Sequence, residues 1–316
     1  MADLQRILRY DKFMSAQPAI RTRGLTKFYG QTRGIENLDL RVERGEVFGF
    51  LGPNGAGKST TINLLMGFRK PSRGSATILG QPVGPGNTAL RRRLGFMPGE
   101  LSLYENMKAG DLLRYFGNLR GGVQWDYVEE LADRFSLDLT RKIKDLSKGN
   151  KQKVALVQAW MHRPDVLILD EPTSGLDPLI QQEFHELVQE AKKGGTTVFL
   201  SSHVLSEVEH LCDRAAIIRN GRLVMLERMS SLHERTIRHL EVTFVGRAPR
   251  AIFDRVAGVS GVSVERNVLR CTVHGGMDRV VKRLAKHRVK NLISEHASLE
   301  ELFFKEYGEE PAEEPG

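Results

Sequence analysis

The chain has 316 residues and a mass of 35.5 kDa, with 40% hydrophobic and 27% charged residues. This composition excludes a disordered or fibrous protein, and the length predicts two domains. Lys and Arg outnumber Asp and Glu by 47 to 39, a net charge of +8 that favours anionic partners without choosing among nucleotides, nucleic acid and lipid headgroups.

The cysteines and the apolar segments of the sequence indicate the cellular compartment in which the protein works. Cys212 and Cys271 have no second Cys or His at metal-ligand spacing, so we expect neither a disulfide framework nor a zinc site. The charge-free stretches 74–90 and 194–206 are too short, and too rich in Gly, Pro, Ser and Thr, to cross a bilayer. The N-terminus lacks the apolar core of a secretory signal. We therefore expect a cytosolic protein, unless a partner holds it at a membrane.

The first two thirds of the chain read as an α/β fold. Residues 1–17 are expected to be a flexible arm, in which Met14 is a candidate for the true initiator. From Pro18 onward we expect short apolar strands to alternate with helices. Four of these strands are almost wholly apolar, as buried parallel strands are, namely 47–51, 166–169, 198–200 and 215–218. Apolar residues at helical spacing predict a helix from Pro178 to Gly194, and about 100–162 is expected to be a mostly helical insertion.

The last part of the chain has another pattern. Strands are expected over 240–245, 259–265, 268–273 and 289–295, and helices over about 249–257, 277–287 and 298–307. The order β-α-β-β-α-β-α predicts a small α+β domain of ferredoxin-like type. We therefore expect a first domain over 18–235, an accessory domain over 236–307, and a disordered tail over 308–316.

A glycine-rich motif follows the first buried strand. Residues 52–59 read Gly-Pro-Asn-Gly-Ala-Gly-Lys-Ser, which matches the phosphate-loop pattern between a strand and a helix. Glycines let backbone N–H groups wrap phosphates, and the helix N-terminus adds its positive dipole end. The motif predicts that Lys58 reaches the β- and γ-phosphates and that Ser59 binds Mg²⁺. The nucleotide-binding set is Gly52, Pro53, Asn54, Gly55, Ala56, Gly57, Lys58, Ser59 and Thr60.

A second motif ends in two carboxylates. The apolar strand 166–169 leads directly into Asp170 and Glu171, at the sheet edge where open α/β folds bind ligands. Asp170 fits the acid associated with Mg²⁺, and Glu171 fits the group that orients and deprotonates an attacking water. Such a sequence alone is often a simple strand end, but together with the phosphate loop it predicts nucleotide hydrolysis.

Between these motifs, residues 146–152 read Leu-Ser-Lys-Gly-Asn-Lys-Gln, which resembles the Leu-Ser-Gly-Gly-Gln element of ABC ATPases. Residues 174–177 resemble the D-loop of that family, His203 its switch histidine, and Tyr29 the aromatic residue that stacks on adenine. The ordered match spans about residues 18–225. It implies a P-loop NTPase cassette that hydrolyses ATP with Mg²⁺, with Lys58, Glu171 and His203 catalytic and with Ser59 and Asp170 on the metal.

The same resemblance implies a second cassette. In the family, the positions of Ser147, Gly149 and Asp177 complete the site of the opposite subunit, so that two ATP molecules lie between two cassettes. One chain carries one cassette here and cannot close either site alone. We therefore expect a dimer, either a paired heterodimer or, by preference, a homodimer.

The sequence departs from the family pattern in two places. Gly99 stands where the family usually has a Gln, and glycine has no side chain to touch Mg²⁺ or water. Either Glu100 or a water substitutes, or the coupling of hydrolysis to partner motion differs; the sequence leaves these open. Lys148 and Asn150 replace Gly and Gln in the signature element. We expect hydrolysis to persist, because Lys58, Asp170, Glu171 and His203 are all present.

Residues 100–107 and 297–303 resemble the single-cassette exporters of drugs, antibiotics and polysaccharides. That resemblance implies an ATPase subunit, peripheral on the cytoplasmic face of the cell membrane. It would drive export of a drug, antibiotic, lipid or polysaccharide-type substrate through a separate integral membrane permease, whose helices the insertion near 100–145 receives. The C-terminal domain would contact its twin or regulate closure, the alternative being a passive extension.

Two rival functions stay open. One is a non-transport ABC ATPase acting on the ribosome or nucleic acid, which the net positive charge fits. The single cassette, the compact insertion and the lack of a zinc pattern favour export, so nucleic acid is not the partner we expect. The other is a nucleotide-binding module that hydrolyses poorly, which Gly99 suggests.

Overall fold

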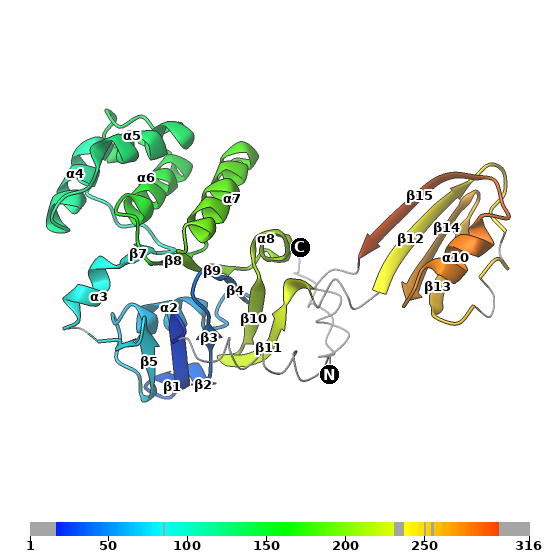
Figure 1. Cartoon of the computed structure of the whole chain (residues 1–316), viewed down its shortest axis with the longest axis horizontal. Helices are drawn as coiled ribbons and strands as arrows, with labels where there is room; N and C mark the ends of the chain where they lie inside the picture. Colours follow the sequence, from blue (N-terminus) through cyan, green and yellow to red (C-terminus); the bar gives the residue numbers. More distant parts are fainter. Residues whose placement is uncertain (1–16, 85, 231–236, 250, 254–255, 297–316) are drawn as a thin grey trace, which may run out of the picture. The chain divides into compact units, whose positions relative to one another are not determined.

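The computed structural model describes residues 17–84, 86–230, 237–249, 251–253 and 256–296 (Figure 1). The chain divides between Glu227 and Arg228 into two compact units. The N-terminal arm up to residue 16, the helix expected over 298–307 and the tail expected over 308–316 lie outside the described residues.

The first unit is built on a six-stranded sheet with the order β11-β10-β4-β9-β8-β7. Strands β10, β4, β9, β8 and β7 pair in parallel. Their bounds are β4 (Val47–Leu51), β7 (Leu94–Met97), β8 (Val166–Asp170), β9 (Thr197–Ser202), β10 (Arg214–Arg219) and β11 (Arg222–Arg228). Every residue of β4, β8 and β9 is buried, which confirms the buried parallel strands predicted from their apolar runs.

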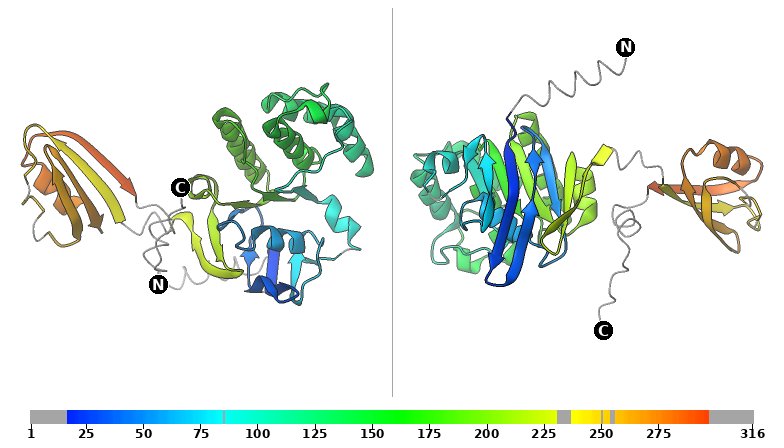
Figure 2. Two further views of the ribbon diagram at one scale, coloured as in Figure 1. Left: turned by 180° about the vertical axis from the view of Figure 1, so that it is seen from behind. Right: turned by 90° about the horizontal axis from the view of Figure 1, so that it is seen from below.

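A second sheet is antiparallel, and its strands come from the segments before and after the phosphate loop in the sequence. It consists of β1 (Ile20–Tyr29), β2 (Thr32–Leu38), β3 (Arg41–Val42), β5 (Arg73–Ile78) and β6 (Gln81–Pro82), and Figure 2 shows β1, β2 and β5 side by side. The expected alternation of strands with helices from Pro18 is therefore wrong over 20–42, where three strands follow one another. A tight turn at Gly30, with φ +62°, lets Tyr29 pair directly with Thr32.

The helices of this unit fall into two groups. Those that connect strands are α2 (Lys58–Leu65), α3 (Thr88–Arg92), α7 (Pro178–Lys193) and α8 (Leu205–Leu211). The predicted insertion holds α4 (Ala109–Leu119), α5 (Trp125–Arg134), the 3₁₀ turn η1 (Ile143–Asp145) and α6 (Lys148–Trp160), which confirms its helical character. Arg134 ties the insertion to α7 through ion pairs with Glu183 and Glu190.

One hydrophobic core joins both sheets to α2, with Ile20, Ile62 and Ile168 among its members. At its centre the Phe199 ring of β9 lies 5.8 Å from the Phe48 ring and 5.4 Å from the Phe50 ring of β4. These ring contacts fix the spacing of the two strands that lead into the phosphate loop and the His203 loop. Across the described ranges, no helix combines the length and apolar character needed to cross a membrane.

The second unit is a four-stranded antiparallel sheet with the order β13-β14-β12-β15. Its elements are β12 (Ile237–Phe244), β13 (Val259–Glu265), β14 (Val268–His274), α10 (Asp278–Leu284) and β15 (Val289–His296). Figure 1 shows α10 across one face of the sheet, and its Val280 and Leu284 belong to the same buried hydrophobic cluster as Leu240 and Leu269. The described part of this unit combines four strands with one helix, so the ferredoxin-like arrangement stays a prediction. The helix expected over about 249–257 differs, because residues 251–253 form a turn.

Replacing Phe199 with Ala tests the role of the ring cluster. The fully buried ring fills the space between β4 and its neighbours, so its removal leaves a cavity and should lower the free energy of unfolding of this unit by about 3–5 kcal/mol. Denaturant titration of the full chain measures the change. The matched control Phe68→Ala, at a ring that is 50% exposed, should cost less than about 1 kcal/mol. Equal effects of the two substitutions would contradict the assignment.

Candidate functional site

The phosphate loop connects β4 to α2 and is shaped by its glycines. Gly55 and Gly57 have φ angles of +78° and +112°, which side-chain-bearing residues rarely adopt. A Cβ on Gly57 would lie 2.7 Å from the Gly34 carbonyl oxygen, and one on Gly52 would lie 2.4 Å from the Ile218 carbonyl oxygen. The loop can therefore keep this path only with glycine at these positions.

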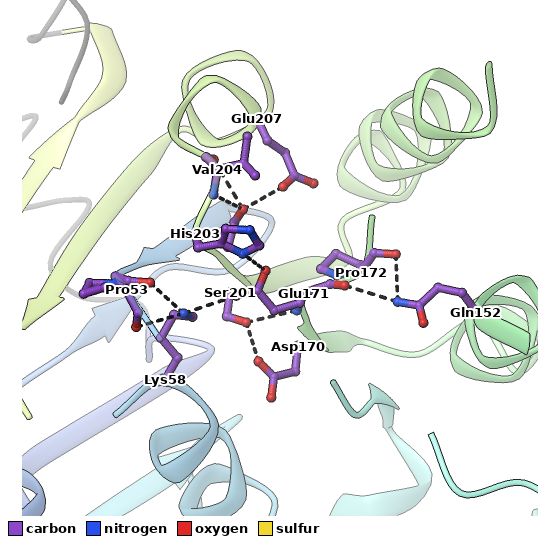
Figure 3. Close-up of polar contacts among 12 residues, drawn as sticks. Pro53, Lys58, Gln152, Asp170, Glu171, Pro172, Ser201, His203, Val204 and Glu207 are labelled. Carbon is purple, nitrogen blue, oxygen red and sulfur yellow. Dashed lines mark hydrogen bonds and ion pairs between the residues drawn. The ribbon is translucent and has the colours of Figure 1, made fainter. Parts of the chain in front are cut away.

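Lys58 is the first residue of α2 and is nearly buried, with 6% of its surface exposed. Its Nζ donates hydrogen bonds to the carbonyl oxygens of Gly52 at 2.6 Å and Pro53 at 3.2 Å (Figure 3). The same atom forms an ion pair with Glu171 Oε1 at 3.2 Å. The ammonium group thus lies inside the curve of the loop, where it faces the end of β8.

The two carboxylates at the end of β8 point in different directions. Asp170 is 4% exposed, and its Oδ1 accepts a hydrogen bond of 2.5 Å from the Ser201 hydroxyl of β9. Glu171 has a left-handed backbone with φ +51°, and its N–H donates to the same Ser201 oxygen at 3.1 Å. This backbone turn sends the Glu171 side chain toward Lys58 and not along the strand direction.

His203 follows the end of β9 and meets the same carboxylate. Its Nδ1 lies 2.6 Å from Glu171 Oε2, so the two oxygens of Glu171 face one basic group each (Figure 3). The imidazole is 53% exposed, whereas Glu171 is 20% exposed. The carboxylate is therefore held between a buried ammonium group and a solvent-facing ring.

These groups line one hollow of about 850 Å³. Its lining contains most of the residues that the sequence analysis selected, namely Tyr29, Pro53, Asn54, Gly55, Gly57, Lys58, Ser59, Thr60, Asp170, Glu171 and His203. Gly52 and Ala56 shape the loop from behind it, and Ala56 is buried in the core. The hollow has the size and the concentration of donors that a nucleoside triphosphate requires.

Ser147, Gly149 and Asp177 are not part of this lining. Ser147 caps α6, its Oγ accepting from the Asn150 N–H at 3.3 Å, and Asp177 caps α7 through the Ile180 N–H at 3.1 Å. The two caps lie close together, because a Cβ on Gly149 would be 2.7 Å from the Gly175 carbonyl oxygen. The structure thus brings these residues to each other and not to the hollow of their own chain.

Gly99 and Glu100 both line the hollow. A Cβ on Gly99 would lie 3.2 Å from Asp170 Oδ2, so this position faces the Asp170 carboxylate directly. The glycine leaves the carboxylate uncrowded, and the exposed Glu100 is the next charged group along the chain.

The donor set suits Mg²⁺, which prefers oxygen ligands and keeps several waters. The Ser59 hydroxyl and the Asp170 carboxylate line the same hollow, and within the described ranges Asp170 Oδ2 has no hydrogen-bond partner. The same ranges hold no group of three or more His, Cys, Asp or Glu that could bind a metal by itself. A cation here would therefore need phosphate oxygens and waters as ligands in addition to the oxygens of the protein.

Sequence reasoning missed Glu207, on α8 (Figure 3). This carboxyl is 8% exposed, and its Oε2 accepts a hydrogen bond of 2.8 Å from the hydroxyl of Ser202, the residue before His203. Its buried Oε1 has no hydrogen-bond partner among the described residues. Burial raises the pKa of Glu207, an effect that the hydrogen bond from Ser202 opposes. No sequence motif identifies Glu207, because only its burial in the folded structure distinguishes it from other acidic residues on helices.

Glu207→Gln tests this burial through the pH dependence of stability. Because the folded chain holds the Glu207 proton more tightly than the unfolded chain, stability is full below the ordinary pKa of about 4.5 and falls as pH rises through the folded value. The variant lacks this loss. The difference in free energy of unfolding between variant and wild type should therefore shift in favour of the variant as the pH rises from 4 to 8. Denaturant titrations measure the difference, and the exposed Glu186→Gln controls for the lost charge. A difference that does not change with pH would contradict the assignment.

Comparison with known proteins places this arrangement in a family. A family model described as "ABC transporter" matches residues 35–174. The "Linearmycin resistance ATP-binding protein LnrL" of Bacillus subtilis (strain 168) is 31% identical over 301 residues, covering 90% of this chain and 96% of LnrL. The "Probable multidrug ABC transporter ATP-binding protein YbhF" of Escherichia coli (strain K12) is 37% identical over 213 residues, which are 66% of this chain but only 37% of YbhF.

A solved structure titled "Structure of ATP binding subunit of ABC transporter" agrees with the fold. Its TM-score is 0.63 at 32% identity, and the match covers 68% of this chain and 92% of that chain. The phosphate loop, the paired carboxylates and the histidine thus occur in the fold that the sequence analysis expected. The chain belongs to the ABC transporter ATP-binding proteins, a family whose nucleotide-binding domain hydrolyses ATP to drive transport.

Proposed function

We propose that this chain is the ATPase subunit of an exporter that moves a drug, antibiotic, lipid or polysaccharide-type substrate through a separate permease. The carrying observation is the Glu171 carboxylate, placed between Lys58 and His203 at the edge of the phosphate-loop hollow. The names of LnrL and YbhF, which refer to linearmycin resistance and multidrug transport, support the class of substrate.

In the proposed reaction each group of the hollow has one role. The loop N–H groups and Lys58 bind the β- and γ-phosphates, while Tyr29 stacks on the adenine. Ser59 and Asp170 would hold Mg²⁺, which neutralises charge on the phosphate oxygens when bound. Glu171 accepts the proton of a water whose oxygen bonds to the γ-phosphorus, as the bond from that phosphorus to the bridging oxygen of ADP breaks. His203 holds Glu171 in the direction of that water.

A second cassette belongs to the proposal. Ser147 and Asp177 lie at helix N-termini outside the hollow of their own chain, and the Ser147 hydroxyl is exposed. Backbone N–H groups at such termini bind phosphate oxygens. We assign them, with Gly149, to the nucleotide of a second copy, so that ATP binding closes a homodimer and hydrolysis opens it.

The permease contact is proposed for the helical insertion. Tyr104 and Tyr115 are 57% and 43% exposed, and their rings meet edge to face at 6.0 Å. Leu119, on the same helix as Tyr115, is 62% exposed. Exposed aromatic and aliphatic side chains near one another are typical of a protein interface. A permease bound here would hold the chain at the cytoplasmic face of the membrane.

Glu171→Gln tests the catalytic assignment. The amide cannot accept the water's proton, so phosphate release by the assembled complex should fall by about 10²- to 10⁴-fold, while ATP binding changes by less than about threefold. Glu186→Gln, on the exposed side of α7, is the matched control. Hydrolysis by Glu171→Gln at the wild-type rate would contradict the assignment.

Purification of the Glu171→Gln variant with ATP tests the export function. From native membranes in detergent, the variant should recover a multi-spanning membrane protein. Recovery of ribosomes or nucleic acid in its place would overturn the export function.

Glu100→Lys tests the coupling between the hollow and the insertion. Glu100 lines the hollow and begins the segment that leads into α4, so its charge reversal should disturb the permease contact more than the nucleotide. Substrate transport should fall by at least about tenfold, with the affinity for ATP within about threefold of the wild type. Glu186→Lys serves as the control for charge reversal. Equal losses of transport and ATP binding would argue against a coupling role.

A further inference from the structure

The second unit, residues 228–316, contains fifteen Lys and Arg against thirteen Asp and Glu, a net charge of +2, but these charges are unevenly distributed along the sequence. Residues 237–296 contain twelve Lys and Arg against five Asp and Glu, a net charge of +7, whereas residues 297–316 contain one Lys against seven Glu. The ATPase site described above uses none of these residues. Their distribution within the unit shows where the charge gathers.

Three connections meet at one end of the four-stranded sheet. Because β14 and β15 are antiparallel to β12, their first residues lie beside its last. Backbone hydrogen bonds join the connections there, from Phe244 N–H to the Asn267 oxygen at 2.8 Å and from Val245 N–H to the Arg288 oxygen at 2.8 Å. A third bond runs from Ala248 N–H to the Arg266 oxygen at 3.1 Å. The three connections are therefore fixed to one another.

Four exposed cations lie on these connections, namely Arg247, Arg266, Lys286 and Arg288, and exposed Lys290 lies at the start of β15. We call these five residues the basic end. None of the five forms an ion pair with a carboxylate of the described residues. Other cations of the unit differ, because Arg270 binds Glu241 and Lys282 binds Asp278. Glu265, the acid next to Arg266, faces Arg270 at 3.5 Å. Among the described residues, the fold thus places positive charge without a carboxylate partner at this end.

The surface of the basic end is hollowed and partly apolar. A concavity of about 730 Å³ is lined by Gly246, Arg247, Ala248, Val264, Arg266 and Asn267. Val245, which directly precedes this lining, is 54% exposed. A concave cationic surface with an aliphatic side chain beside it suits phosphate groups attached to apolar chains.

We propose that the basic end binds a membrane surface that contains anionic phospholipids. Clustered Lys and Arg are attracted to such a surface when they lie within about one Debye length of it. Each of these residues adds a similar amount to the free energy of binding. The choice of a membrane as the anionic partner rests on the proposed function, which already places the chain beside a permease. The basic end would give it a second attachment, independent of nucleotide.

Nucleic acid fits the same surface less well. Binding of single strands uses exposed aromatic rings on which bases stack. In the described part of the second unit, the exposed large hydrophobic residues are Val245, Val262, Val281, Leu292 and Ile293, and none is aromatic. Phe244 and Phe253 are both buried in the core of the unit. The observations therefore favour lipid headgroups.

Vesicle flotation of the full chain tests the proposal. The probes are phosphatidylcholine vesicles with and without phosphatidylglycerol, at about 0.05 M and about 0.5 M salt. The variant combines Arg247→Gln, Arg266→Gln and Arg288→Gln. If each charge contributes about a fivefold factor, the variant should bind anionic vesicles about a hundredfold more weakly, and high salt should abolish the difference.

The matched control combines Arg238→Gln, Arg279→Gln and Lys282→Gln, which remove the same charge from the same unit away from the basic end. This control should weaken vesicle binding by less than about fivefold. Thermal unfolding of the second unit, unchanged in both variants, reports that this unit is folded, and unchanged ATP affinity reports the same for the first unit. The proposal is overturned by equal binding of variant and wild type, by equal losses in variant and control, by equal binding to neutral vesicles, or by loss of RNA binding with vesicle binding intact.

The test separates this inference from the proposed function. Vesicle binding is measured without permease or hydrolysis. Loss of vesicle binding confined to the basic-end variant supports the inference even if the chain proves inactive as an ATPase. Conversely, an active exporter subunit whose basic-end variant floats like the wild type keeps its function and loses this surface.

Discussion

The carboxylate of Glu171 joins three distant segments of the chain. Its oxygens lie 3.2 Å from Lys58 Nζ and 2.6 Å from His203 Nδ1, and its own backbone continues β8. The left-handed φ of +51° that aims it there costs about 1–2 kcal/mol for a residue with a side chain. Ser201 offsets this cost by bonding both Asp170 and the Glu171 N–H. Strands β4, β9 and β8 are neighbours in the sheet, and the buried phenylalanines of β4 and β9 hold the segments that carry Lys58, His203 and Glu171 next to one another.

Much of this site could be predicted because its chemistry restricts residue identity locally. The phosphate loop accepts only glycine where φ is positive or where a Cβ would strike a carbonyl oxygen, so Gly52, Gly55 and Gly57 are visible in the sequence. The apolar runs of β4 and β8 are equally legible, since strands buried on both faces admit few polar residues. The carboxylates of Asp170, the last residue of β8, and of Glu171 after it depart from that rule, and such departures are expected at functional sites.

Other parts could not be read from the sequence. Glu207 looks like any helix-surface acid until the structure buries it against Ser202. Strand β1 pairs with its neighbour β2 in a tight hairpin and with the distant β5 on its other side, and the pattern of apolar residues does not specify these partners. Likewise, the sequence shows Gly99 only as a missing side chain, whereas the structure shows that a Cβ at this position would lie 3.2 Å from Asp170 Oδ2.

The close approach of Gly149 to Gly175 has a consequence for how two cassettes could meet. No side chain fits between the start of α6 and the loop that leads into α7, because a Cβ on Gly149 would lie 2.7 Å from the Gly175 oxygen. The start of α6 and the loop before α7 are therefore packed backbone against backbone, so a displacement of one presses on the other. In the proposed dimer, the two segments assigned to the second copy's nucleotide are already in contact within each chain before the two chains meet.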